Sequence, residues 1–164
     1  MQIIYFQKTS ELRRAKPELE KRLNININIE GRKATIIGKS FEEYEASIVL
    51  DAINFGFSAK KALTLKDENM VFRIINIKNF TRKKNLKDVR ARVIGSRGRT
   101  KKTIENITNC EIFIKDNEVG LIGNVELIDE ITTALSSLIR GTKQANTYRY
   151  LEKINKRKKL YKEN

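Results

Sequence analysis

The chain has 164 residues, 40% hydrophobic and 33% charged, a composition that excludes a disordered protein and allows a sizeable core. A net charge of +14 favours a polyanionic partner, for which nucleic acid is the usual choice. The single cysteine, Cys110, excludes an intrachain disulfide and fits a reducing compartment. Apolar runs fall far short of the ~20 residues that span a bilayer. No secretory signal is predicted, so we expect a cytoplasmic protein without a membrane partner.

The positive charge is concentrated in two segments of the chain. Residues 78–102 carry eleven lysines and arginines against one acidic residue, Asp88, and residues 141–164 carry eight against two. Residues 103–140 are acidic, with seven Asp or Glu residues against two basic ones. An ordinary solvated surface would mix the two signs, so this distribution favours a localised anion-binding region.

The first half of the chain predicts a strand, a helix and two further strands before a second helix. A β-favouring run covers residues 2–6, and apolar residues recur at helical spacing over residues 12–23. Isoleucine alternates with asparagine over residues 24–29, and this period of two indicates a half-buried strand. Residues 33–37 form the returning strand of the predicted hairpin.

The second helix is predicted to begin at Ser40, because Ser40 and Glu43 match the pattern of a capping box. Its expected buried stripe consists of Phe41, Tyr44, Ile48, Ala52 and Phe55. Residues 57–68 are predicted to be a helix followed by a linker.

The second half predicts the same order of elements with one additional helix. The expected elements are a strand at 70–77, helices at about 86–94 and 99–108, strands around 112–114 and 119–122, and a last helix that ends near Gly141. Asn24 and the Ile-Gly pair at 37–38 recur 85 residues later as Asn109 and the pair at 122–123. The chain therefore contains an internal repeat with an offset of 85.

Two glycines, Gly95 and Gly98, lie three residues apart between two predicted helices of the second copy. Glycine lets another backbone approach closely, and the helix after the loop directs free N–H groups and its positive dipole end toward it. In the first copy the corresponding residues are Ser10 and Arg13. We therefore expect the first copy to keep the scaffold and to lack the site.

The candidate nucleic-acid site surrounds this loop, with cations around it and a groove for bases beside the following strand. The expected RNA-binding residues are Val93, Ile94, Gly95, Ser96, Arg97, Gly98, Arg99, Thr100, Lys101, Lys102 and Ile112. An ordinary core position is the alternative for Ile112. A solvated linker is the alternative for the basic residues at 82–84.

The order strand–helix–Gly-x-x-Gly–helix–strand–strand–helix is that of the KH domain, which binds RNA and single strands. The sequence GSRGRTKKTIENIT at 95–108, LIG at 121–123 and the stretch from Gly141 to Tyr148 resemble the Partner-of-Nob (Dim-type) ribosome-assembly proteins, whose archaeal members have two KH modules. The resemblance implies an α+β fold of two tandem type I KH-like modules. Each is a three-stranded antiparallel sheet packed by helices, and the first is degenerate and lacks the GxxG loop.

The expected domains are a degenerate KH-like module at 1–68, a KH domain with the GSRG loop at 69–145 and a basic C-terminal tail at 146–164. Within the tail, the stretch from Lys153 to Lys162 is predicted to be either a frayed helix or a disordered arm. The resemblance implies a factor in small ribosomal subunit biogenesis and rRNA processing that binds near the 3′ end of small-subunit rRNA. It also implies two protein partners, the Nob-type endonuclease and the alpha subunit of initiation factor two.

A protein-interaction scaffold with incidental RNA binding is the alternative function. The acidic stretch 103–140 and the aromatic residues Tyr44, Phe55 and Phe57 are its candidate surfaces. An enzyme is not expected, because the chain has no histidine and its basic segment holds a single carboxylate. The sequence therefore predicts no catalytic residue, no metal site and no cofactor.

Overall fold

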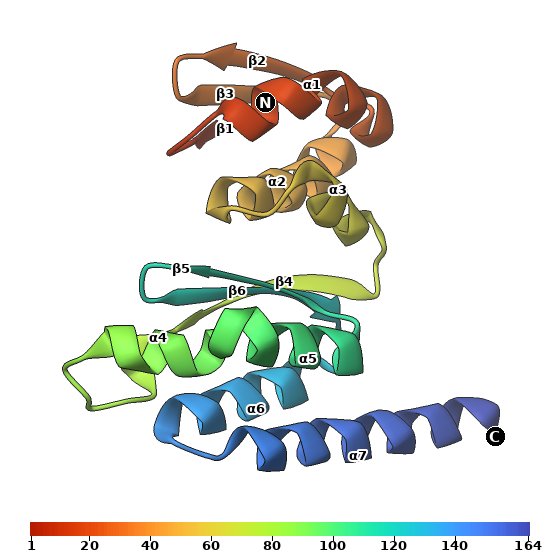
Figure 1. Ribbon diagram of the computed structural model, residues 1–164. Coiled ribbons are helices and arrows are strands. Elements are labelled where there is room, and N and C mark those ends of the chain that lie inside the picture. Colours follow the sequence, from red (N-terminus) through yellow and green to blue (C-terminus); the bar gives the residue numbers. More distant parts are fainter. The chain divides into compact units, whose positions relative to one another are not determined.

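The computed structural model describes residues 1–164 and divides them into two compact units, Met1–Phe72 and Arg73–Asn164. Each unit contains a three-stranded antiparallel sheet and helices (Figure 1). This confirms the α+β class predicted from the sequence. None of the helices has the length and apolar character needed to cross a membrane.

The first unit contains three strands, three α-helices and a 3-10 helix, η1 (Leu63–Lys66). Its elements are β1 (Gln2–Tyr5), α1 (Ser10–Leu23), β2 (Asn26–Glu30), β3 (Lys33–Ile37), α2 (Ser40–Phe55) and α3 (Ala59–Ala62). β3 is the central strand, antiparallel to both β1 and β2. Ile27 of β2 stands opposite Ile36 of β3, and both side chains are buried, whereas Asn26 and Asn28 are exposed. The alternation therefore places isoleucine on the buried face of β2 and asparagine on its exposed face, as predicted.

The predicted apolar stripe of α2 is wrong at its N-terminal end. Phe41 and Tyr44 are 71% and 61% exposed, and Ile48 is only half-buried. The buried side chains of this helix are those of Glu43, Ala46, Val49, Leu50, Ala52, Ile53 and Phe55. Apolar residues occur on most sides of α2, so spacing alone did not select the buried face.

The predicted capping box is also wrong. The N-cap residue of α2 is Lys39, and its side chain makes no capping hydrogen bond. Glu43 reaches back as a capping-box glutamate would, but its Oε1 accepts the N–H of Gly38 at 3.0 Å. The glutamate therefore joins the first turn of α2 to the end of β3.

The second unit has the same succession of elements with α4 added. Its sheet includes β4 (Met70–Asn76), whose first three residues precede the boundary at Arg73. Its other elements are α4 (Leu86–Ile94), α5 (Arg99–Thr108), β5 (Glu111–Lys115), β6 (Glu118–Asn124), α6 (Ile128–Arg140) and α7 (Gln144–Glu163). The strand order is β4-β6-β5, which matches the order β1-β3-β2 of the first unit. Val93, Ile104, Leu121 and Leu135 are fully buried, so helices and sheet share one core.

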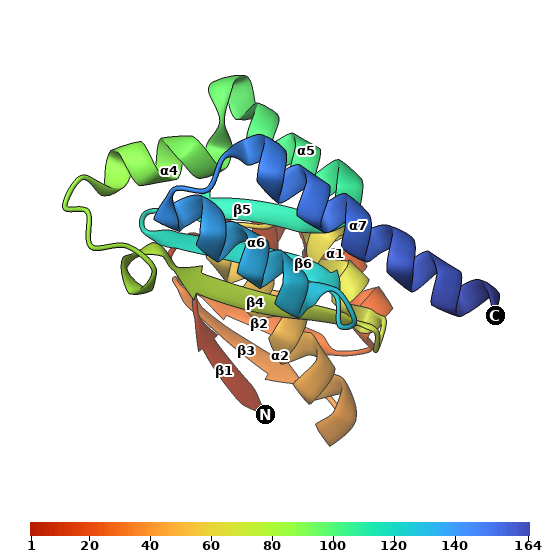
Figure 2. The same cartoon turned by 90° about the horizontal axis from the view of Figure 1, so that it is seen from below.

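Residues 144–163 form the helix α7, which decides between the two alternatives left open for the basic tail. Figure 2 shows α7 running alongside both α5 and α6. Thr147 and Leu151 are buried, and the side-chain amide of Asn155 donates to the carbonyl of Ile107 at 2.9 Å. The first part of the tail is therefore packed against the rest of the second unit.

The offset of 85 extends to backbone conformation. Asn24 and Asn109 end α1 and α5 in the same left-handed conformation, with φ of 54° and 55°. The hairpin turns place Gly31 and Asp116 at φ of 59° and 52°. The units differ upstream, because only residues 6–9 separate β1 from α1, whereas residues 77–98 separate β4 from α5 and contain α4.

Candidate nucleic-acid interface

Four residues, 95–98, connect α4 to α5. Gly95 ends α4 at φ 77° and ψ 169°, a conformation essentially restricted to glycine, and its N–H donates to the carbonyl of Ala91 at 2.8 Å. Arg97 and Gly98 both adopt positive φ, 55° and 73°, and α5 begins at the next residue. The loop therefore lies directly against the N-terminus of α5, where backbone N–H groups lack partners within the helix.

The two glycines of the loop serve different purposes. A Cβ on Gly95 would lie 2.2 Å from Oγ1 and 2.5 Å from the backbone N of Thr100, so the loop packs on the first turn of α5 without room for a side chain. A Cβ on Gly98 would meet nothing within 4 Å. Gly95 thus closes the inner side of the loop, while Gly98 leaves the outer side open to an approaching molecule.

The charge at the loop is largely uncompensated. Arg97, Arg99 and Lys102 are exposed, and none of their side chains has a hydrogen-bond or ion-pair partner. Lys101 differs, because its ammonium lies 3.0 Å from Oε1 of Glu105. Three of the four predicted cations therefore remain available to an anion, and the fourth is shared with a carboxylate.

The structure separates the predicted site residues by exposure. Ser96, Arg97, Arg99 and Lys102 are exposed, and Ile94, Gly95, Gly98 and Lys101 are half-buried. Val93, Thr100 and Ile112 are buried, at 0%, 4% and 2% exposure. The side chain of Ile112 thus lies in the core, its alternative assignment, and cannot line a groove for bases.

Two contacts that the sequence did not single out fix the surroundings of the loop. Glu105 accepts the N–H of Ile112 at 3.1 Å and so joins α5 to the outer strand β5. Arg90 donates from Nη1 to the carbonyl of Asp116 at 2.9 Å and joins α4 to the turn between β5 and β6. The offset of 85 was the available signal for the first contact, because Glu20 binds the corresponding amide of β2 at 2.9 Å.

Cys110 is a core residue that follows the C-terminal end of α5, the end opposite the loop. It is 2% exposed, burial raises the pKa of its thiol to about 11, and the hydroxyl of Thr108 donates to its Sγ at 3.0 Å. No group of three or more His, Cys, Asp or Glu side chains in the structure is arranged to hold a metal ion.

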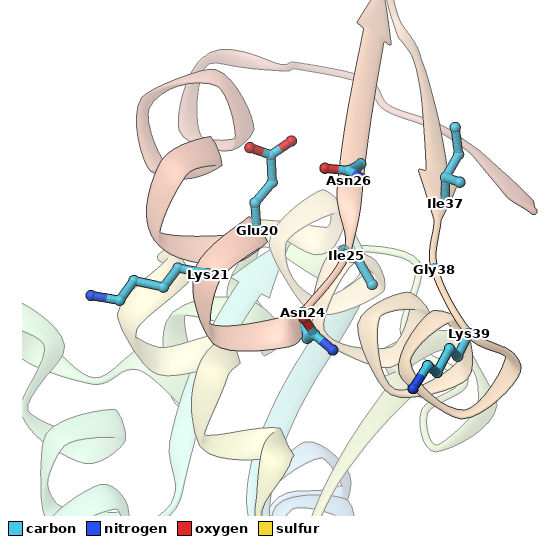
Figure 3. Close-up of a pocket in the computed structure, with 8 residues that line it drawn as sticks. All are labelled: Glu20, Lys21, Asn24, Ile25, Asn26, Ile37, Gly38 and Lys39. Atoms are coloured by element: carbon cyan, nitrogen blue, oxygen red, sulfur yellow. The ribbon is translucent and has the colours of Figure 1, made fainter.

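The first unit has a polar hollow of about 530 Å³ where α1 ends and α2 begins (Figure 3). Its lining residues are Glu20, Lys21, Asn24, Ile25, Asn26, Ile37, Gly38 and Lys39. A Cβ on Gly38 would lie 3.0 Å from Cγ2 of Ile25, and a Cβ on Gly123 would lie 3.2 Å from Cβ of Cys110 in the second unit. Close packing at this glycine is therefore common to both units.

Comparison with known families identifies a KH domain in the second half of the chain. The family model for the second KH domain of PNO1 proteins, described as a eukaryotic-type KH domain of type I, matches residues 71–156. The chain belongs to this family. The resemblance to the Partner-of-Nob (Dim-type) proteins, which rests on the residues around the loop, is confirmed.

Curated relatives match most of this chain, and two of the three described here have names that mention RNA. A KH domain-containing protein of Methanocaldococcus jannaschii is 28% identical over 84% of this chain. The pre-rRNA-processing protein pno1 of Emericella nidulans is 26% identical over 84% of it, and the RNA-binding protein pno1 of Dictyostelium discoideum 27% identical over 83%. The chain spans 64%, 57% and 60% of the lengths of these three relatives.

Solved structures resemble the whole chain. Dim2p from Pyrococcus horikoshii has a TM-score of 0.81 at 28% identity, with 93% of this chain and 98% of that chain covered. A complex of a/eIF2alpha, aDim2p and rRNA from the same organism contains a chain with a TM-score of 0.81 at 28% identity, with 94% and 93% covered. Both units of the present fold therefore occur together in a solved relative.

Proposed function

We propose that this protein is an RNA-binding KH protein of small ribosomal subunit biogenesis that binds near the 3′ end of small-subunit rRNA through the GSRG loop at 95–98. The observation that carries the proposal is the loop itself, which is closed on its inner side and open at Gly98. Unpaired cations surround the loop, so a sugar-phosphate strand meets backbone N–H groups and positive charge together. The solved complex of a relative with rRNA supports the choice of ligand.

The two modules have different roles in this proposal. The KH domain at 69–145 binds RNA, and the tail at 146–164 supports it as α7. The module at 1–68 is a degenerate KH-like module, because the four residues between β1 and α1 leave no room for a helix and a glycine loop. Its cations are also more often paired with carboxylates than those of the KH domain at 69–145. Examples are the pairs Arg14–Glu11 at 2.6 Å and Lys16–Glu20 at 3.8 Å.

In this proposal the first module binds the protein partners. Its sheet exposes Ile3, Tyr5 and Ile37 on one face, at 44%, 70% and 47%, and this apolar surface favours a protein over RNA. The partners proposed are the alpha subunit of initiation factor two, which is bound together with aDim2p and rRNA in the solved complex, and the Nob-type endonuclease. This surface also favours the second candidate function, a protein-interaction scaffold with incidental RNA binding.

Two of the three aromatic residues expected to serve such a scaffold do not lie on its surface. Phe55 and Phe57 are 8% and 2% exposed, and their rings contact each other and that of Phe72. Tyr44 remains exposed.

The proposal contains no catalytic step. Glu105 follows the loop on α5, and its two oxygens are engaged by Lys101 and by the N–H of Ile112. Purified protein should therefore leave RNA intact in the presence of Mg²⁺. Cleavage that is lost in the variant Glu105→Ala would contradict this part of the proposal.

Crosslinking of the protein to cellular RNA, followed by mapping of the crosslinked nucleotides, tests the function. We expect crosslinks near the 3′ end of small-subunit rRNA, and peptides that contain residues 95–102 should carry them. Crosslinks scattered over unrelated RNAs, or absent from the loop, would favour the scaffold.

A further inference from the structure

α7 carries a row of cations on the face that points away from the rest of the unit. Arg149, Lys153, Lys156 and Arg157 follow each other at steps of four, three and one, which place them on one side of a helix. All four are exposed, and none has a hydrogen-bond or ion-pair partner. These four residues form the α7 stripe.

Two lysines of α7 outside the stripe, Lys158 and Lys162, are paired with carboxylates near α6. Lys158 lies 3.6 Å from Glu130 of α6, and Lys162 lies 3.8 Å from Glu126, which precedes α6. Glu152 is the one carboxylate on α7 between positions 149 and 157, and it pairs with none of the stripe residues. The cations that face α6 are therefore compensated, and those of the stripe are not.

The helix that carries the stripe is fixed to the rest of the second unit. Thr147 and Leu151 are buried on the opposite side of α7, and Asn155 holds the helix to the last turn of α5 through the carbonyl of Ile107. α7 lies beside α5 and continues beyond it (Figure 2). Positive charge therefore occurs both at the loop and on the neighbouring helix α7. There the stripe extends for about 12 Å, from residue 149 to residue 157.

We propose that the α7 stripe is a second RNA contact, which binds the phosphate backbone of nucleotides that flank the segment held at the GSRG loop. The inference rests on the proposed function for the identity of the ligand. Long cationic side chains on a helix face reach phosphates without reading base edges, so the stripe adds affinity and no sequence preference. Its partner is RNA longer than the roughly four nucleotides that a KH loop clamps.

Two RNAs and two matched variants test this inference. One RNA has about four nucleotides and fills the loop site alone, and the other is a single strand several times longer that contains the same segment. The stripe variant replaces Arg149, Lys153, Lys156 and Arg157 by Gln, which keeps helix propensity high. The control variant removes the same charge from the first unit, through Gln at the exposed residues Lys8, Lys21, Lys39 and Lys60.

We expect the stripe variant to bind the short RNA as the unchanged protein does and the long RNA about tenfold more weakly at low salt, with a slope of log affinity against log salt smaller by about 2 to 3. The control variant should bind both RNAs nearly as the unchanged protein does. Unchanged affinity of the stripe variant for the long RNA would overturn the inference and leave the stripe to solvent or to an acidic protein. Equal losses in the two variants would overturn it too, because net charge would then explain the effect. Failure of the unchanged protein to bind either RNA would instead refute the proposed function.

Discussion

A methyl group on Gly95 would overlap with Thr100, whose Oγ1 and backbone N lie 2.2 Å and 2.5 Å from the position of the missing Cβ. The two residues belong to successive elements, the end of α4 and the first turn of α5. Their contact holds the loop against the helix that presents its N–H groups. The stability of the second unit and the geometry of the proposed RNA site thus depend on the same glycine.

The two loop glycines should differ in their response to substitution. Gly95→Ala forces a side chain into a glycine-only conformation and into Thr100, and it should lower the free energy of unfolding by about 3 kcal/mol or more. Gly98→Ala introduces only the cost of a left-handed residue, about 1 to 2 kcal/mol, because no atom lies near its Cβ position. Urea unfolding followed by circular dichroism measures both values. Equal losses would contradict the assignment of separate roles.

Much of the fold follows from the sequence because the repeat relates residues with strict backbone demands. Asn24 and Asn109 both end helices in the left-handed conformation, and few residue types do so at low cost. The alternation at residues 24–29 likewise predicted which face of β2 is buried. In α2 the same reasoning failed, since Phe41 and Tyr44 are apolar and yet exposed.

The site was less predictable than the fold. The glycine spacing located the loop, but the pairing of Lys101 with Glu105 and the burial of Ile112 depend on packing between α5 and β5. The composition did not predict that α7 is an ordered helix, because its charged stretch is typical of both a helix and a disordered arm. Its few anchors, Leu151 and Asn155 among them, became evident only with α5 in place.

Glu11 should stabilise the first unit in a pH-dependent way. Its carboxylate accepts hydrogen bonds from Arg14 and from the N–H of Ala59 in α3, and these bonds lower its pKa below the ordinary 4.5, with the Arg14 bond the largest cause. A carboxylate whose pKa is lowered by folding contributes stability above about pH 4.5, and the contribution is lost as the pH falls through the folded-state pKa. Glu11→Gln should therefore cost about 1 kcal/mol at pH 7 and much less in acid.

Glu18→Gln provides the matched control for that substitution. Glu18 lies on the same helix, and its pair with Arg22, at 4.0 Å, is more than half exposed. Its replacement should change the stability little at any pH. Urea unfolding at pH 7 and in acid measures both variants, and an equal effect of the two substitutions at pH 7 would contradict the role of Glu11.

The thiol of Cys110 should react with thiol reagents only after unfolding. The side chain is buried and its pKa is about 11, so the reactive thiolate is scarce at pH 8 and enclosed. The unfolded thiol ionises first as the pH rises, so stability should fall between about pH 9 and 11, and Cys110→Ala should lack this fall. Rapid labelling of the folded protein at pH 8 would show that the residue is accessible.

The most direct test of the central claim is the affinity of the variant with Ser96→Asp and Arg97→Asp for single-stranded RNA. Both residues are exposed, so the variant should fold normally, as circular dichroism can verify. Two negative charges at the open side of the loop should weaken binding at least about tenfold, because they repel the phosphate that the loop is proposed to hold. An affinity equal to that of the unchanged protein would mean that RNA does not bind at this loop.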